Sequence, residues 1–222
     1  IVGQRMGALF GTSFVRDSSG AIVHENSAGY PRPQIDTNRK ILGFGIAPTQ
    51  LGIGASFRYK DLNASFLIEG KSGGQIYSGT NMEMLGRGLH KMTIPAGGRE
   101  SGFVPDGVMT DGSPVTQSLS VVEQQNYWNR YNDAAESGIY DADYMRLRQL
   151  SIGYTIPSDM LEGTFINSAS VSLIGKNLFF ISNDTENIDP ESSYNASGRT
   201  AGLEYWGMPV PRTVGINVNL KF

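Results

Sequence analysis

The sequence predicts an all-β protein, and more narrowly a segment of an antiparallel transmembrane β-barrel with long extracellular loops. Apolar and polar residues alternate with period two in several segments of about the length that crosses a membrane. Very short turns and very long links connect these segments, an asymmetry typical of outer-membrane barrels. The chain of 222 residues is also rich in glycine, with 28, and in aromatic side chains. This composition favours strands, because glycine weakens helix interiors.

The alternation predicts about six strands. In chain order they cover residues 5–14, 51–59, 62–69, 150–156, 168–181 and 213–222. In the first, Met6, Phe10 and Phe14 share one face. The second and third form a hairpin, because only the polar pair Lys60-Asp61 separates two alternating runs. The fourth ends at Pro157, since proline cannot donate to a ladder. The fifth has mixed alternation, so its faces stay unassigned.

The last strand has the clearest pattern, although a strand of a soluble protein can show the same one. Its apolar face contains Val214, Ile216, Val218, Leu220 and Phe222. Its other face contains Gly215, Asn217, Asn219 and Lys221. A tilted strand crosses a bilayer in ~9–11 residues, which matches this segment.

The remaining connections are long and cover residues 16–50, 72–144 and 182–212. They contain most of the prolines and many turn signals. Links of this length are uncommon in compact domains and usually carry function. In an up-and-down barrel they would face the outside, and the last strand would descend to a periplasmic C-terminus.

Two arginines depart from the pattern. Arg146 and Arg148 share the parity of Leu150, so both would face lipid unless a bulge near Gln149 intervenes. One interpretation is such a bulge, or the start of the strand. The other is contact with phosphates of outer-leaflet glycolipid at headgroup level, where a charge costs about 0–1 kcal/mol.

Composition and motifs exclude several functions. The net charge is −3, so no basic footprint for nucleic acid exists. The absence of cysteine excludes thiolate metal sites, catalytic thiols and disulfides. No nucleophile elbow, phosphate loop or dinucleotide fingerprint is present. We therefore predict that the chain is not an enzyme and binds no cofactor.

Several motifs together resemble SusC/RagA-type TonB-dependent transporters. They are the run from Tyr144 to Pro157, Gly175-Lys176-Asn177-Leu178-Phe179, Asp189-Pro190-Glu191, Pro211-Arg212-Thr213 before a strand ending in Phe222, and upstream Leu42 to Pro48, Phe57 to Lys60 and Gly73-Gly74. Their order and spacing cover almost the whole chain.

The resemblance implies a barrel of about 22 strands around a plug. It further implies active import of oligosaccharides or peptides across the outer membrane of Bacteroidota-type bacteria, energised through TonB and closed by a SusD-like surface lipoprotein. About six strands alone would leave unpaired edges in lipid. Residues 1–222 are therefore expected to be the C-terminal portion of a longer barrel, with the plug and N-terminal domains outside this chain.

Loop aromatics are the candidate substrate contacts, because aromatic faces suit sugar rings and peptide side chains. These are Tyr127 and Trp128, near Tyr131, and Tyr205 and Trp206. Alternatively, they pack their own loops or the lid protein. The resemblance identifies Phe222 as a barrel-assembly signal, while membership of an interfacial aromatic girdle is compatible with that role.

Metal sites have little support. His24 and His90 lie far apart and have no partners at metal-ligand spacing. Asp184, Glu186, Asp189 and Glu191 form an acidic cluster that either binds calcium or is a solvated loop.

Two other functions stay open. One is a small autonomous outer-membrane barrel with a binding or adhesion role, which would need two more strands, for which residues 97–120 are candidates. The other is a secreted β-sandwich that binds carbohydrate. Detergent dependence separates the sandwich from the barrels.

Overall fold

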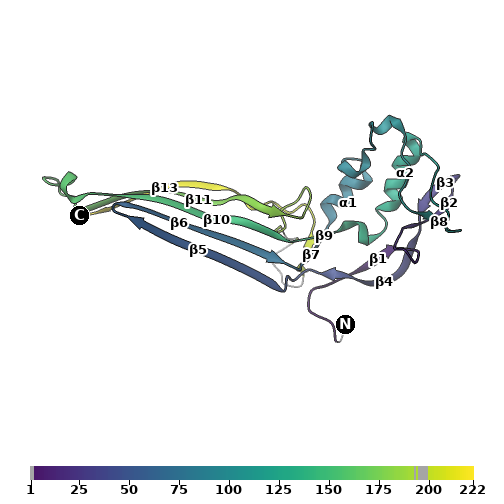
Figure 1. The fold of residues 1–222 in the computed structure, drawn as a ribbon, viewed down its shortest axis with the longest axis horizontal. Coiled ribbons are helices and arrows are strands. Elements are labelled where there is room, and N and C mark those ends of the chain that lie inside the picture. The colour runs from purple at the N-terminus through teal and green to yellow at the C-terminus, as the bar shows by residue number, and fades with distance from the viewer. Residues whose placement is uncertain (1–2, 193, 195–199) are drawn as a thin grey trace.

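Five long strands form one antiparallel sheet in the computed structural model, which describes residues 3–192, 194 and 200–222. The spatial order is β13-β11-β10-β6-β5. Their bounds are β5 (Thr49–Tyr59), β6 (Leu62–Ser72), β10 (Tyr144–Ile156), β11 (Ser168–Asn183) and β13 (Thr213–Lys221). Five of the six predicted strands are these. The C-terminus lies at the end of the sheet farthest from the helices (Figure 1).

The register of these strands separates an apolar face from a polar one. Tyr59, Leu62, Tyr154, Val171 and Val218 are successive partners across the sheet and form one apolar row. Phe57, Ala64, Ile152, Leu173 and Ile216 form the next row. The side chains of the first row are 42% to 71% exposed, so the described chain leaves this face uncovered. Pairing also assigns the faces of β11, which its mixed alternation could not.

The opposite face has small and polar side chains. One row across it consists of Arg58, Asn63, Gly153, Ser172 and Asn217. Gly153 leaves room there for the side chains of Asn63 and Ser172, which a Cβ at this position would push aside.

A bulge in β10 changes which face its side chains occupy. Gln149 pairs with Leu67 and Leu147 pairs with Ile68, so Arg148 has no partner on β6. The extra residue reverses the alternation, and Arg146 pairs with Glu69 on the polar face. The predicted bulge near Gln149 is therefore confirmed.

Smaller sheets extend beyond the main one. β1 (Ala8–Phe14) pairs with β4 (Ile35–Phe44), a strand inside the link predicted for residues 16–50. The strand predicted at residues 5–14 thus belongs to a separate two-stranded sheet. The other small strands are β2 (Val23–Ser27), β3 (Tyr30–Pro33) and β8 (Val108–Met109) in one sheet, and β7 (Gln75–Ser78), β9 (Ile139–Asp141) and β12 (Leu203–Glu204) in another.

Helices occupy the link predicted for residues 72–144. They are α1 (Gly79–Gly86), α2 (Val121–Tyr131) and the 3₁₀ turns η1 (Lys91–Thr93), η2 (Arg99–Ser101) and η3 (Ala135–Gly138); a further turn, η4 (Ser158–Met160), joins β10 to β11. Ser120 and Glu123 form a capping box at the start of α2, which fixes that helix end. In the described residues, no helix combines the length and apolar character needed to cross a membrane.

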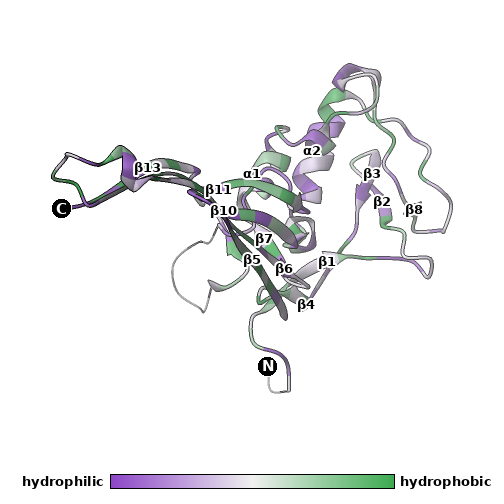
Figure 2. Ribbon diagram, turned by 60° about the vertical axis from the view of Figure 1, so that its left-hand side comes forward, coloured by the Kyte–Doolittle hydropathy of each residue, from purple (hydrophilic) through white to green (hydrophobic). Residues whose placement is uncertain are grey.

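The helices enclose the main apolar core. It consists of Tyr30, Leu85, Leu119, Tyr127 and Trp128, with Phe103 and Tyr131 packed against it. The β2–β3–β8 sheet lies beyond α2, on the far side from the main sheet (Figure 1, Figure 2). We call residues 79–138, which contain α1, α2 and η1 to η3, the helical unit.

Candidate functional site

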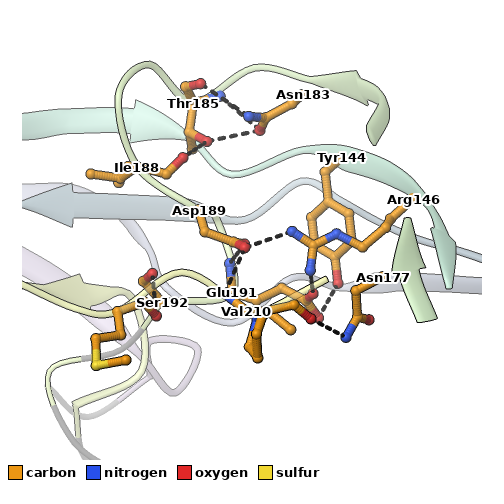
Figure 3. Close-up of polar contacts among 12 residues, drawn as sticks. Tyr144, Arg146, Asn177, Asn183, Thr185, Ile188, Asp189, Glu191, Ser192 and Val210 are labelled. Atoms are coloured by element: carbon orange, nitrogen blue, oxygen red, sulfur yellow. Dashed lines mark hydrogen bonds and ion pairs between the residues drawn. The ribbon is translucent and has the colours of Figure 1, made fainter. Parts of the chain in front are cut away.

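Buried ion pairs attach the link between β11 and β13 to the polar face of the sheet. We call the described residues of this link, 184–192, 194 and 200–212, the last loop. The Arg146 guanidinium lies 2.6 Å from Asp189 Oδ2 and 2.6 Å from Glu191 Oε2. It also stacks on the Phe180 ring, 3.8 Å from the centroid. The Arg146 and Asp189 side chains are only 3% and 4% exposed. Figure 3 shows both carboxylates converging on Arg146.

The bulged Arg148 extends this network. Its guanidinium contacts Glu191 Oε1 at 2.7 Å, Glu69 Oε2 at 2.7 Å and Asn177 Oδ1 at 2.7 Å. The Tyr144 hydroxyl donates to Glu191 Oε1 at 2.8 Å. Burial alone would raise the pKa of Glu191, but the donors from Arg148 and Tyr144 outweigh it and hold that pKa below its ordinary value.

These contacts bear on two sequence-based interpretations. Contact of Arg146 and Arg148 with glycolipid phosphate is wrong, because both guanidiniums are paired with carboxylates on the polar face. The acidic residues do not gather around one point, since Glu186 pairs with Lys91 at 2.5 Å instead. The described part of the chain contains no group of three or more His, Asp or Glu side chains placed to hold a metal ion.

The last loop also exposes an aromatic pair. The Tyr205 and Trp206 rings meet edge to face, with centroids 6.0 Å apart and planes at 87°. Their side chains are 42% and 62% exposed. Trp206 has a φ of +54°, which is uncommon for a bulky residue and is maintained by its surroundings.

A buried carboxylate holds this pair in place. Glu204 is 1% exposed and accepts hydrogen bonds from Ser78 Oγ at 2.7 Å, Thr80 Oγ1 at 2.6 Å and Gly207 N at 2.9 Å. Trp206 N donates to Thr80 Oγ1 at 2.8 Å. Ser78 is the N-cap of α1, so the helix N-terminus also favours the negative charge.

Gly79 provides the space for the Tyr205 ring. A Cβ at that position would collide with the ring, whose hydroxyl donates to Glu83 Oε1 at 3.3 Å. The pair is therefore rigidly supported from α1 while one side remains accessible, as a preorganised contact for a ligand requires.

The other predicted substrate contacts are buried. Tyr127 and Trp128 are 2% and 6% exposed, and their rings pack against each other with centroids 5.3 Å apart. Their aromatic faces are covered by the core of the helical unit, so the structure places them in packing rather than at a surface. Tyr205 and Trp206 stay predicted substrate contacts.

The remaining predicted residues lie elsewhere. Phe222 is 68% exposed and stacks on Phe165, with centroids 5.7 Å apart, at the end of the sheet away from the helices. His24 and His90 are both fully buried, and burial lowers the pKa of each. His24 contacts the Tyr127 hydroxyl, and His90 caps η1 through Met92 N, so each has a structural role.

Sequence reasoning missed Glu204, Ser78 and Thr80. Glu204 lies 126 positions after Ser78 and 124 positions after Thr80, and no local sequence pattern predicts contacts over such a distance. The bulged Arg-x-Arg run was the available signal for the network on β10.

Comparisons with known proteins agree on one type of molecule. The chain is 28% identical over 194 residues to TonB-dependent receptor P3 of Formosa agariphila, and 24% identical over 199 residues to TonB-dependent receptor P26 of the same organism. These alignments cover 83% and 82% of this chain but only 17% and 18% of the relatives. No family model matches the chain.

Solved structures show the same fold. The RagAB peptide importer in its closed-closed state superposes with a TM-score of 0.59 at 13% identity, covering 97% of this chain and 23% of that one. The open-open state also gives 0.59, at 14% identity. The chain resembles SusC/RagA-type TonB-dependent transporters and has the fold of a segment of their β-barrel.

Proposed function

We propose that this chain is the C-terminal part of the barrel of an outer-membrane importer, which takes up oligosaccharides or peptides by TonB-dependent active transport. The observation that carries the proposal is the two-faced sheet. Its uncovered apolar rows suit a hydrocarbon environment, and its small polar rows suit an aqueous lumen. The similarity to TonB-dependent receptors supports the same assignment.

The polarity and partners belong to this proposal. The turn between β5 and β6 and the C-terminus lie at one end of the sheet, which we assign to the periplasm. The helical unit and the last loop then face outward, where a SusD-like lipoprotein would close over them. TonB would act through regions outside residues 1–222. Tyr205 and Trp206 are the proposed substrate contacts from this chain.

Extraction and uptake test the proposal together. Outer membranes should release the native polypeptide only in detergent, at a mass several times the 24.1 kDa of this segment. Cells expressing the full protein should accumulate labelled oligosaccharide or peptide, and a protonophore should abolish that uptake. Release without detergent would instead favour a secreted β-domain, and a native mass near that of this segment would favour a small autonomous barrel. Uptake that is insensitive to the protonophore would exclude TonB dependence.

A further inference from the structure

The last loop is attached to the polar face of the sheet by both of its limbs. Asp189 and Glu191, on the outgoing limb, bind Arg146. On the returning limb, Val210 N donates to Asp189 Oδ2 at 3.1 Å, and Asn177 Nδ2 donates to the Pro211 carbonyl at 3.2 Å. The loop therefore does not extend away from the end of the sheet but folds back over its polar side.

The same loop is attached to the helical unit at a second place. Asn81 Nδ2 donates to the Glu186 carbonyl at 2.9 Å, and Asn187 Nδ2 donates to Asn81 Oδ1 at 3.0 Å. Asn81 is fully buried. The loop is thus attached to β10 on one side and to α1 on the other, where Glu204 also accepts hydrogen bonds from Ser78 Oγ and Thr80 Oγ1.

The charges in this attachment are costly to bury. Two guanidiniums and two loop carboxylates meet on the polar face of the sheet, and such a group is stable only when its partners are all in place. The strands are already held together by their main-chain hydrogen bonds. The ion-pair network is therefore needed to hold the loop in place, not to hold the strands together.

We propose that the last loop forms a constriction on the lumen side of the barrel wall, anchored by Arg146, which limits the size of the substrate that passes. The inference rests on the proposed barrel function, because the polar face lines a lumen only in a closed barrel. Loosening the anchor should admit larger molecules while leaving the barrel assembled.

Single cysteines report passage past the loop, since the chain itself contains none. Gln50→Cys lies on the polar face of β5 in the row of Lys71 and Tyr144, one row nearer the helical unit than Arg146. Gln149→Cys lies one row beyond it. The full-length protein, with any cysteine elsewhere replaced by serine, is treated from outside with a small and with a bulky membrane-impermeant thiol reagent.

The constriction predicts a size-selective difference between the two positions. Gln50→Cys should react with both reagents, whereas Gln149→Cys should react with the bulky one at least about tenfold more slowly than with the small one, the factor that ~1.4 kcal/mol represents. If the ratio of small-reagent to bulky-reagent labelling rates were the same at both positions, the constriction would be overturned. Neither substitution removes a side chain of the ion-pair network.

Glu191→Gln then tests the anchor. It removes one charge at nearly constant shape and should raise bulky labelling at Gln149→Cys, while Glu100→Gln on the exposed turn η2 should not. Unchanged labelling in an assembled Glu191→Gln protein would contradict the role of the anchor. Ile216→Cys, on the apolar face, separates the two proposals. Rapid labelling of Ile216→Cys would refute the barrel. If Ile216→Cys is protected from labelling but Gln149→Cys reacts equally fast with the small and the bulky reagent, only the constriction is refuted.

Discussion

Arg146 binds two carboxylates in a space from which water is almost excluded. Removing one partner of a buried pair costs about 3–5 kcal/mol, because the other charge is left without compensation. Arg146→Met should therefore release the last loop from the sheet, seen as faster amide hydrogen exchange at residues 184–192. Arg130→Met is the matched control, since its ion pair with Asp133 is exposed and such pairs contribute about 0–1 kcal/mol. If neither variant changed the rate of amide hydrogen exchange at residues 184–192, the network would not be what holds the loop.

Glu191 makes the same attachment sensitive to acid. Its pKa is below the ordinary value of 4.5, so its contribution to stability is fully present above that value and is lost as the pH falls through the lower, folded-state value. Proteolysis of the last loop should thus accelerate in the wild type as the pH falls below the ordinary pKa of 4.5. In Glu191→Gln the loop should be cut quickly at every pH. A wild-type rate without this transition would mean that Glu191 does not titrate as part of the attachment.

The two tryptophans of the chain have opposite environments, and their alanine variants should differ accordingly. Trp128→Ala removes a core side chain and should destabilise the helical unit by about 3–5 kcal/mol. Trp206→Ala should leave folding intact and weaken substrate binding or uptake. Thermal unfolding together with an uptake assay separates these effects, with the exposed Phe165→Ala as control. Loss of uptake in Phe165→Ala as well would show that exposed aromatics in general, not this pair, determine the result.

At the scale of the element, β13 offers a direct test of which face meets lipid. Val214 pairs with Gly175, beside Leu150 and Phe66, in an apolar row about midway along β6, and Asn217 pairs with Ser172 in a polar row. Val214→Lys should cost about 2–4 kcal/mol near the bilayer midplane, whereas Asn217→Lys should be tolerated. Urea titration of the full-length protein refolded into vesicles measures both. Equal destabilisation by the two substitutions would contradict the proposed orientation of the sheet.

The strands were the most predictable elements, for a physical reason. Alternation depends on the side-chain period of the strand itself, so the hairpin β5–β6 and the last strand could be assigned from their own residues. β4 was missed because its residues 35–44 lie in a link rich in turn signals and pair with β1, about 30 positions earlier. Helix α2 was missed although its capping-box residues, Ser120 and Glu123, were visible in the sequence.

At the scale of the whole molecule, the sequence predicted the type of fold but not how the loops are placed. The resemblance pointed to a partial transporter barrel, which the similar receptors and the superposed importer support. Local patterns could not place Glu204 under α1 or Asp189 beside Arg146, because those contacts join distant segments. For the same reason the sequence left open whether the acidic residues bind calcium or form a solvated loop, and whether Tyr127 and Trp128 contact substrate or pack their own loop.

The double attachment of the last loop also has a mechanical consequence. The chain connections next to β7 and β9 join the helical unit to the main sheet, and so does the last loop. A further route runs through β1 and β4, because Glu136 of η3 pairs with Arg16 and accepts a hydrogen bond from Phe14 N. A pull on the helical unit would load the ion pairs of Arg146 alongside those connections. The last loop would therefore transmit part of this force from the helical unit to β10. In a single-molecule pulling experiment, Arg146→Met should lower the force at which the helical unit detaches, without changing the force that extracts the strands.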